Sequence, residues 1–265
     1  MKRTLKLVLY YFGYQLAFTI VASVISVVLA HLGMVDKDVA ILNATAIALL
    51  LSGIMMGWHL IHFKYITFGW KSFGEVPAKS LWLSIPFILA SMVFINLCSE
   101  FIDLPNWMEN DFFAMSRNLF GILSVAVMAP VVEEFLFRGA IEGHLLRQGK
   151  KPWAAIFISA LVFGIIHINP AQVPFAFAIG LVFGWLYYRT GSMVPGILGH
   201  FINNSIACIQ MATLSKEELH TKTADMIGQE ATLALFLASF IVMAGLFLYM
   251  KKHLPKAPEY KEEII

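Results

Sequence analysis

Ionisable side chains interrupt long apolar stretches of this sequence, and their types are those that enzymes use for proton transfer and hydrolysis. Glu133, Glu134 and Arg138 stand in one such stretch, and His167 and His200 stand in two later ones. Burying these groups costs free energy unless each is paired, hydrated or bound to a metal. We therefore predict that they form a functional site.

The spacing of the first three groups predicts how they divide their charges. Glu134 and Arg138 are four residues apart, so their side chains can pair on one face of a helix. Glu133 points about 100° away around the same axis and is left uncompensated. It therefore requires a cation or a hydrogen-bonded water. Pro130 lies just before it and removes a backbone hydrogen bond, which predicts a kink in the helix at this point.

Two further apolar stretches bring partners to these carboxylates. The turn after the first stretch lies near Lys150, with Glu134 16 residues before it and His167 17 residues after it. In an antiparallel hairpin with a rise of about 1.5 Å per residue, these two side chains reach similar depth. His200 and Asn204 are four residues apart in a later stretch and share a helix face. The sequence thus predicts a cluster of two glutamates, two histidines, one asparagine and one arginine.

Each of these groups also has a purely structural interpretation. A single histidine between membrane helices more often makes a helix–helix hydrogen bond than it binds a ligand, and the Glu134–Arg138 pair could be an architectural clasp. When the groups are considered together, a purely structural interpretation requires several independent and costly coincidences. We therefore favour the functional interpretation. The alternatives that stay open are a non-catalytic immunity or scaffold protein and a proton- or cation-coupled transporter. No internal repeat is visible, which lowers the transporter alternative.

The composition predicts the class of protein that holds this cluster. Of 265 residues, 59% are apolar and only 14% are charged, which excludes an ordinary soluble enzyme and a disordered chain. Cys98 and Cys208 are too few for a disulfide scaffold, and a net charge of +2 gives no reason to expect nucleic acid. We predict an all-α, polytopic integral membrane bundle of about eight transmembrane helices. The expected spans lie near residues 5–32, 39–62, 80–99, 117–147, 152–168, 171–189, 193–213 and 229–250.

The chain is expected to form a single integral membrane domain over residues 1–265, with a catalytic core near 117–213 and a short cytoplasmic tail at 251–265. If the N-terminus is cytoplasmic, fourteen of the 19 Lys and Arg residues fall on that side, four fall on the other side, and Arg138 falls within a span. The positive-inside rule therefore predicts that both termini are cytoplasmic. We expect a multi-pass protein of the plasma membrane, with the lipid bilayer as its surroundings.

Shorter patterns predict local packing. Gly196 and Gly199, just before the histidine of the later stretch, permit close helix approach, and Gly180 and Gly184 are expected to pack within the chain. Residues 139–147 mix apolar and charged side chains in a way that could form an amphipathic extension at the membrane interface. Such an extension would bring the carboxylates nearer the cytoplasmic surface than the hairpin argument does.

The clustered residues fall into three short motifs that follow one another in order. These motifs are Glu133-Glu134-x-x-x-Arg138, Phe163-x-x-x-His167 and His200-x-x-x-Asn204. In this respect the chain resembles the CPBP intramembrane proteases, also called the CAAX prenyl protease 2 or Abi family, whose motifs are EExxxR, FxxxH and HxxxN. The resemblance covers about residues 117–213. Each motif alone is short, but three in order, each within an expected span, are a specific match.

The resemblance implies an eight-helix membrane peptidase that hydrolyses a peptide bond in a membrane-associated peptide or protein. Similar eukaryotic enzymes remove the last three residues of prenylated CAAX proteins, and bacterial members are linked to peptide processing, self-immunity or protein maturation. Carried over to this sequence, Glu133 and His167 would activate the attacking water, and His200 with Asn204 would stabilise the oxyanion. The site would be held in shape by the remaining pair, Glu134 and Arg138.

Two versions of this chemistry stay open. A divalent metal such as zinc, bound by Glu133, His167 and His200, would offset the unpaired carboxylate and make its bound water more acidic. A metal-free site would instead need Glu133 to act as a general base. The chain lacks the HExxH signature of helical zinc proteases, so the sequence alone establishes no metal. We favour metal assistance as the working hypothesis.

Overall fold

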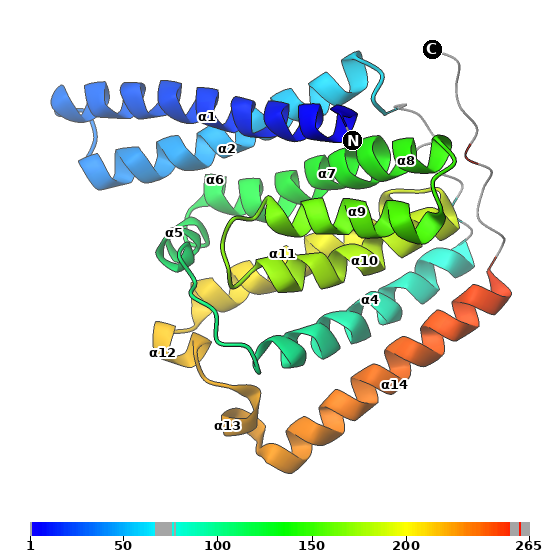
Figure 1. The fold of residues 1–265 in the computed structure, drawn as a ribbon. Helices are drawn as coiled ribbons and strands as arrows, with labels where there is room; N and C mark the ends of the chain where they lie inside the picture. The colour runs from blue at the N-terminus through cyan, green and yellow to red at the C-terminus, as the bar shows by residue number, and fades with distance from the viewer. Residues whose placement is uncertain (1, 67–75, 77, 255–259, 261–265) are drawn as a thin grey trace.

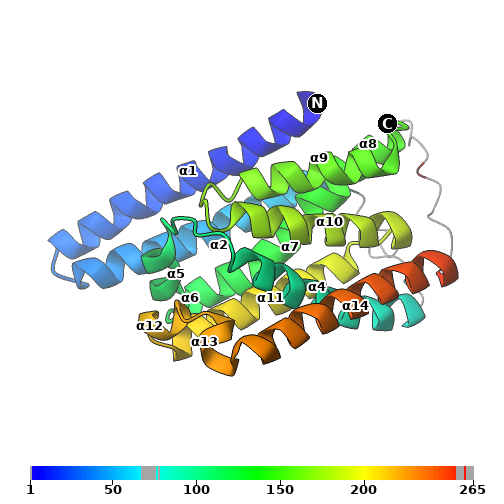
Figure 2. The same ribbon diagram turned by 60° about the horizontal axis from the view of Figure 1, so that its bottom comes forward.

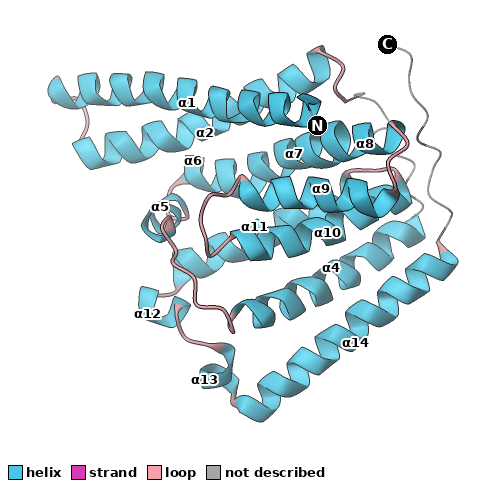
Figure 3. Ribbon diagram, in the orientation of Figure 1, coloured by secondary structure: helices cyan, strands magenta, loops and turns pink. Residues whose placement is uncertain are grey.

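The computed structural model describes residues 2–66, 76, 78–254 and 260, and this part of the chain is helical without a β-strand (Figure 3). The predicted all-α class is therefore confirmed. Most of the predicted tail at 251–265 lies outside the described residues, so its cytoplasmic location stays a prediction.

The long helices lie where the apolar stretches predict them, within about three residues at each end. They are α1 (Lys2–His31), α2 (Lys37–His62), α4 (Ala78–Ser99), α9 (Pro152–Ile165), α10 (Val173–Thr190), α11 (Val194–Thr213) and α14 (Gln229–His253). Residues Leu119–Arg147 form one composite helix. Its successive segments are α6 (Leu119–Ile122), the π-helical η1 (Leu123–Met128), α7 (Ala129–Glu134), the π-helical η2 (Phe135–Glu142) and α8 (Gly143–Arg147). The short helices of the connections are α5 (Glu109–Met115), α12 (Lys216–Leu219) and α13 (Thr223–Ile227).

Five helices in the described part of the chain are long and apolar enough to cross a membrane: α1, α2, α4, the composite helix and α14. They make this a multi-pass membrane protein. The predicted count of eight spans is not confirmed, because α9, α10 and α11 are not among the five. Helix α9 has 14 residues, fewer than the roughly 20 that a helix needs to cross the hydrocarbon core.

Capping and turn residues set several of these helix boundaries. The Asp36 carboxylate caps α2 by accepting hydrogen bonds from the backbone N–H groups of Asp38 at 3.0 Å and Val39 at 3.2 Å. Helix α9 begins at Pro152, where the missing N–H would have no partner within the helix. Gly191 ends α10 with φ of 68°, a left-handed conformation that glycine adopts without strain.

The helices form layers around the composite helix. Figures 1 and 2 show the α1–α2 hairpin on one side of the bundle and α4 with α14 on the other, with the composite helix, α9, α10 and α11 between them. Helix α2 packs on η1 and α7, α9 packs on η2 and α10, and α11 packs on α7 and η1. The charged residues of the composite helix therefore meet protein rather than lipid.

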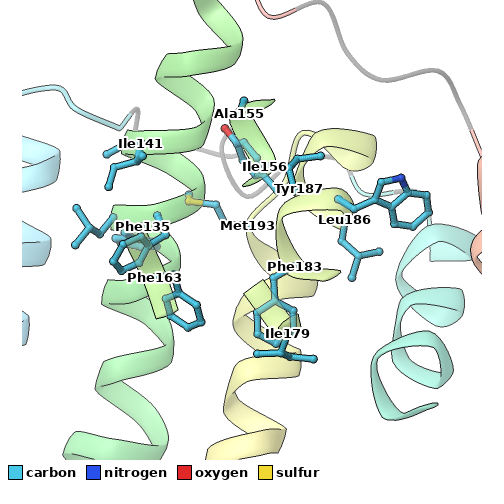
Figure 4. Close-up of a cluster of buried hydrophobic side chains, with 14 of the residues drawn as sticks. Phe135, Ile141, Ala155, Ile156, Phe163, Ile179, Phe183, Leu186, Tyr187 and Met193 are labelled. Atoms are coloured by element: carbon cyan, nitrogen blue, oxygen red, sulfur yellow. The ribbon is translucent and has the colours of Figure 1, made fainter. Parts of the chain in front are cut away.

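Aromatic side chains of α9, α10 and η2 form a buried core beside these charges (Figure 4). Phe163 and Phe183, each 1% exposed, lie at its centre. Helix α10 approaches closely because it presents glycine: a Cβ added to Gly180 would lie 3.2 Å from the Cβ of Ala160, and one added to Gly184 would meet a side chain of η2. The prediction that these glycines pack within the chain is confirmed.

The expected interfacial extension at residues 139–147 is wrong. Ile141 and Leu145 are 1% exposed and Glu142 is 0% exposed, because α9 and α10 cover this part of the composite helix. Glu133 lies at the midpoint of Leu119–Arg147, fourteen residues from each end. Its place along the helix agrees with the deep position that the hairpin argument predicts.

The chain ends that the structure describes lie at one end of the bundle (Figure 1). There the guanidinium of Arg3 donates to the carbonyl of Tyr65 at 3.3 Å, and that of Arg189 donates to the carbonyl of Leu254 at 3.0 Å. The Tyr260 hydroxyl donates to the carbonyl of Tyr187 at 3.0 Å. Arg3 and Arg189, two of the basic residues predicted to share one side of the membrane, thus lie here, whereas the identity of that side stays a prediction.

Close packing at the start of the composite helix gives a stability prediction. A Cβ added to Gly121 would lie 2.8 Å from the backbone Cα of Met115, so Gly121→Ala must displace α5. We expect a loss of about 1–3 kcal/mol, measured as a lower Tm of the purified protein in detergent. The control is Gly13→Ala, because nothing lies within 4 Å of a Cβ at that position. Equal Tm values for the two variants would contradict this packing.

Candidate active site

Two adjacent carboxylates form the centre of the site. Glu133 and Glu134 end α7, and they are 7% and 0% exposed. As successive residues of one helix they point in different directions, so each meets a different set of partners. Two charges this deeply buried require compensation from the surrounding helices.

Arg138 compensates Glu134. Its Nη1 lies 2.9 Å from Glu134 Oε1, the i,i+4 pairing that the sequence predicts, and both side chains are at most 1% exposed. Its Nη2 donates to the carbonyl of Gly180 at 3.1 Å. The guanidinium also lies over the rings of Phe163 and Phe183, at 4.6 and 5.4 Å from their centroids. An ion pair, a backbone acceptor and two aromatic faces thus replace the water that this charge gives up.

His200 lies between the two carboxylates. Its Nδ1 is 3.5 Å from Glu134 Oε1, and its Nε2 is 3.8 Å from Glu133 Oε2. Helix α11 comes this close because Gly196 faces Glu134, where a Cβ would overlap the carboxylate. At Gly199 a Cβ would lie 2.8 Å from both Ile88 and Phe183. The predicted close approach of α11 is therefore confirmed.

Tyr11 of α1 is a partner of Glu133 that the sequence analysis missed. Its hydroxyl donates to Glu133 Oε1 at 3.1 Å. The signal in the sequence is weak, because α1 is apolar over most of its surface and gives no amphipathic pattern that would orient it. One helix face of α1 carries side chains spaced three to four residues apart, namely Thr4, Leu7, Tyr11 and Tyr14.

His167 lies apart from the carboxylates. Its Nδ1 is 2.8 Å from the carbonyl oxygen of Phe163, and within the described ranges no carboxylate oxygen lies within 4.0 Å of its ring nitrogens. The Phe163 ring contacts both histidines, and its centroid lies 5.0 Å from that of His167 and 5.6 Å from that of His200. Both imidazoles are nearly perpendicular to it. The structure thus brings together the two motif histidines around one phenyl ring, and places only His200 beside the carboxylates.

This separation bears on the metal hypothesis. Among the residues that the structure describes, no group of three His, Cys, Asp or Glu side chains could hold a metal ion. The ligand set expected from the sequence does not fit a metal in this arrangement. Glu133 and His200 lie beside each other, but His167 does not join them. No step of the reaction proposed below therefore involves zinc.

The turn that follows His167 is held in a strained conformation. Ile168 has φ of 60°, which is rare for a β-branched residue. Asn169, 1% exposed, fixes this turn: its Oδ1 accepts from the backbone N–H of Trp107 at 3.0 Å and its Nδ2 donates to Asn106 at 2.7 Å. The loop before α5 therefore helps to position His167, a contact between distant segments that no sequence pattern signals.

Asn204 fills a gap in the backbone of the composite helix. In the π-helical register of η1, the N–H of Ala129 bonds to the carbonyl of Ser124. The next donor in that register would be Pro130, which has no N–H to give to the carbonyl of Val125. Asn204 Nδ2 donates to that carbonyl at 2.8 Å. The irregularity that Pro130 predicts is therefore present as a π-helical turn with a side chain from α11 as its missing donor.

Several polar atoms at the centre have no hydrogen-bond partner among the described residues. They include Glu133 Oε2 and His200 Nδ1. Buried polar atoms are costly without partners, so water or a polar substrate group is expected to bind here. The described groups form one sequence of neighbours, from Arg138 through Glu134 and His200 to Glu133. A carboxylate and an imidazole facing one space are able to take a proton from a water molecule.

The Val125 contact predicts a measurable coupling. Asn204→Ala removes the donor to that carbonyl and should lower the free energy of unfolding by about 1–3 kcal/mol. In a Pro130→Ala background the backbone supplies an N–H, so the same substitution should cost less. Thermal unfolding of the wild type, both single variants and the double variant measures this difference. Strictly additive effects would show that Asn204 does not replace the missing proline donor.

Comparison with known proteins agrees with the site. Residues 115–206 match the family model "Type II CAAX prenyl endopeptidase Rce1-like". "Putative membrane peptidase YdiL" of Bacillus subtilis (strain 168) is 28% identical over 105 residues, 40% of this chain and 43% of that protein. "Membrane-embedded CAAX protease MroQ" of Staphylococcus aureus (strain USA300) is 29% identical over 93 residues, 33% of this chain and 38% of that protein. No solved structure matches.

The matches to these relatives span less than half of their length. The family-model match at residues 115–206 contains all three motifs, from Glu133 to Asn204. The resemblance stated from the motifs is thereby confirmed. Over residues 115–206 this membrane protein is similar to the type II CAAX prenyl endopeptidases, in agreement with its resemblance to the CPBP family.

Proposed function

We propose that this protein is an intramembrane endopeptidase that hydrolyses a peptide bond in a membrane-associated peptide or protein. The observation that carries the proposal is the buried approach of His200 to Glu133 at 3.8 Å, beside a second glutamate that Arg138 neutralises. Similarity to a protease family supports the general activity. The assignment of roles to individual residues is our own.

Glu133 acts as the general base in this proposal. A water molecule bound beside Glu133 Oε2 and His200 Nε2 gives a proton to the carboxylate, and its oxygen attacks the carbonyl carbon of the substrate. The carbonyl electrons move to the oxygen, and the tetrahedral intermediate then breaks its C–N bond. The proton returns from Glu133 to the leaving nitrogen. The products are a carboxylic acid and an amine, and the carboxylate is ready for another cycle.

Glu134 and Arg138 set the state of His200. Arg138 pairs with Glu134 at 2.9 Å, and Glu134 Oε1 also faces the Nδ1 of His200 at 3.5 Å. A proton on Nδ1 directed at this carboxylate leaves Nε2 free to accept a hydrogen bond from the water. This second carboxylate therefore supports the reaction through the histidine, without contact with the substrate.

The remaining motif residues take supporting roles. His167 is half-buried beside the Phe163 ring. Its Nδ1 donates to the Phe163 carbonyl, so the Nε2 of the neutral ring can accept a hydrogen bond from water or from a substrate N–H. Asn204 uses one N–H for the Val125 carbonyl, so we assign it first to the support of the helix break and only second to the oxyanion. This differs from the direct carry-over of family roles, which pairs His167 with Glu133.

The location of the site follows from its place in the bundle. Glu133 lies at the midpoint of a helix long enough to cross the membrane, so the substrate must reach the site within or close to the bilayer. We assign the basic end of the bundle to the cytoplasm by the positive-inside rule, and the protein to the plasma membrane. A membrane-associated substrate fits this depth, whether or not it carries a lipid.

The activity is tested with Glu133→Gln. Replacing the carboxylate by a neutral amide of similar shape should lower kcat for a cleaved peptide about 10²–10⁴-fold, because the general base is lost. Glu142→Gln is the matched control, since Glu142 is a buried glutamate of the same composite helix outside the contacts of His200. Wild-type cleavage by Glu133→Gln would remove its role as the base. Tm values in detergent show whether each variant is folded.

The same variants separate the enzyme from its alternatives. His167→Ala and His200→Ala are also expected to abolish cleavage without loss of folding. If cells with any of these three site variants kept the full biological activity of the protein, a non-catalytic immunity or scaffold role would be favoured instead.

The metal version of the reaction gives its own prediction. Because the described residues contain no three-ligand group, we expect full cleavage at negligible metal content and no loss of activity on treatment with a chelator. Elemental analysis of the active purified protein measures this. One zinc ion per chain, lost together with activity in His167→Ala, would instead support the ligand set predicted from the sequence.

A further inference from the structure

Helix α1 lies outside the region that the family model matches, at the periphery of the bundle. Figure 2 shows it along the outer edge, next to α2. Its buried residues are few, namely Thr4, Leu7 and Ser26, and most of its apolar side chains face outward. Its packing is chiefly against α2, with a smaller contact on η2. By position alone, α1 would be taken for a helix that only anchors the protein in lipid.

Two tyrosines of α1 contradict that view, because they point into the bundle. The Tyr14 hydroxyl lies 2.8 Å from the Nδ1 of His59 on α2. One turn earlier on the same face, the Tyr11 hydroxyl donates to Glu133 Oε1 at 3.1 Å. The two contacts have similar geometry and come from the same helix. Tyr14 contacts His59, which takes no part in the proposed reaction, whereas Tyr11 contacts Glu133, the general base of that reaction.

The contact with Tyr11 makes the two oxygens of Glu133 unequal. Oε1 accepts the tyrosine hydrogen bond, whereas Oε2 has no hydrogen-bond partner among the described groups and faces His200 Nε2 at 3.8 Å. The last torsion of a glutamate side chain is broad, so packing alone does not fix the plane of the carboxylate. A hydrogen bond to one oxygen does fix it, and thereby directs the other oxygen toward the place where water must bind.

We propose that Tyr11 is a positioning residue for Glu133: its hydroxyl holds the carboxylate so that Oε2 faces His200 and the attacking water, which makes helix α1 part of the active site. This inference rests on the proposed function, and it extends the site beyond residues 115–206. Tyr11 acts through Glu133 and takes no part in bond making. The site is then assembled from α1, α7, α9 and α11, and it is complete only when α1 is docked.

The test compares Tyr11→Phe with Tyr14→Phe. Each substitution removes one hydroxyl and one hydrogen bond between α1 and the rest of the bundle, so effects on the docking of α1 should be similar. Only Tyr11→Phe frees Glu133. We expect kcat to fall about ten- to hundredfold in Tyr11→Phe with KM nearly unchanged, the loss that a hydrogen bond to a charged group implies. Tyr14→Phe should keep a kcat close to that of the wild type.

A second readout does not depend on cleavage. Dicyclohexylcarbodiimide reacts with protonated carboxyl groups in apolar surroundings, and mass spectrometry reports its adduct at Glu133. Tyr11→Phe leaves Oε1 of Glu133 without its hydroxyl partner and open to the reagent, so this variant should be labelled more than Tyr14→Phe and the wild type. The other titratable and charged groups around Glu133, which are Glu134, Arg138 and His200, are the same in all three proteins.

The outcomes separate the two proposals. If the wild type cleaves and both tyrosine variants have the same kcat, Tyr11 only helps to dock α1 and the inference fails while the function stands. If the wild type cleaves no peptide, the proposed function fails, and the labelling then decides the inference. More labelling in Tyr11→Phe alone supports it, and equal labelling in the two variants overturns it.

Discussion

The structure depends on keeping a charged arginine inside an apolar helical bundle. Arg138 is 1% exposed, and its neighbours are a carboxylate at 2.9 Å, a backbone carbonyl and two aromatic rings. Removal of one partner from such a pair would leave an uncompensated buried charge, which is far costlier than the loss of a surface contact. The positions of Phe163, Phe183 and Gly180 follow from this requirement, because they form the surroundings in which the charge is tolerated.

The ion pair also has a chemical consequence. Arg138 pairs with Glu134, so among the described side chains the polar partners of Glu133 are a tyrosine hydroxyl and a histidine. Two adjacent residues of one helix therefore have opposite uses: one is fixed by charge, and the other is available to exchange a proton. The difference arises from the rotation of about 100° between successive helical residues, which points one at Arg138 and the other at α1.

Much of this arrangement could be predicted from the sequence, since it depends on local spacing. The i,i+4 pair of Glu134 and Arg138, the close approach of α11 at Gly196 and the fold class all follow from residues near one another in the chain. The position of His167 shows where such reasoning ends. The hairpin argument gives its depth, but depth does not fix rotation about the helix axis, and His167 directs its Nδ1 to the carbonyl of Phe163 rather than to a carboxylate.

Tyr11 and residues 139–147 were hidden for a different reason. Helix α1 is apolar on the lipid side and on the protein side alike, so its hydrophobic pattern does not reveal which face meets the bundle. In residues 139–147 the mixture of apolar and charged side chains resembled a surface pattern, whereas Glu142 and the apolar residues beside it are buried under α9 and α10. In a membrane, the lipid-facing and the protein-facing sides of a helix are both apolar, so a hydrophobic pattern does not distinguish them. The contact between Asn204 and Val125 could be found only once the helical register was known.

The π-helical turn at Leu123–Met128 makes the length of the composite helix as important as its side chains. A π-helical turn contains one residue more than an α-helical turn. Because the wide turn absorbs that extra residue, deletion of one residue within it would return the chain to the α-helical register and leave the segment beyond it facing as before. A deletion after the turn, between Ala129 and Glu133, has no wide turn to absorb it and would rotate Glu133 by about 100° away from His200, although no site residue had changed. Substitution scanning cannot detect such a dependence, whereas insertion and deletion scanning can.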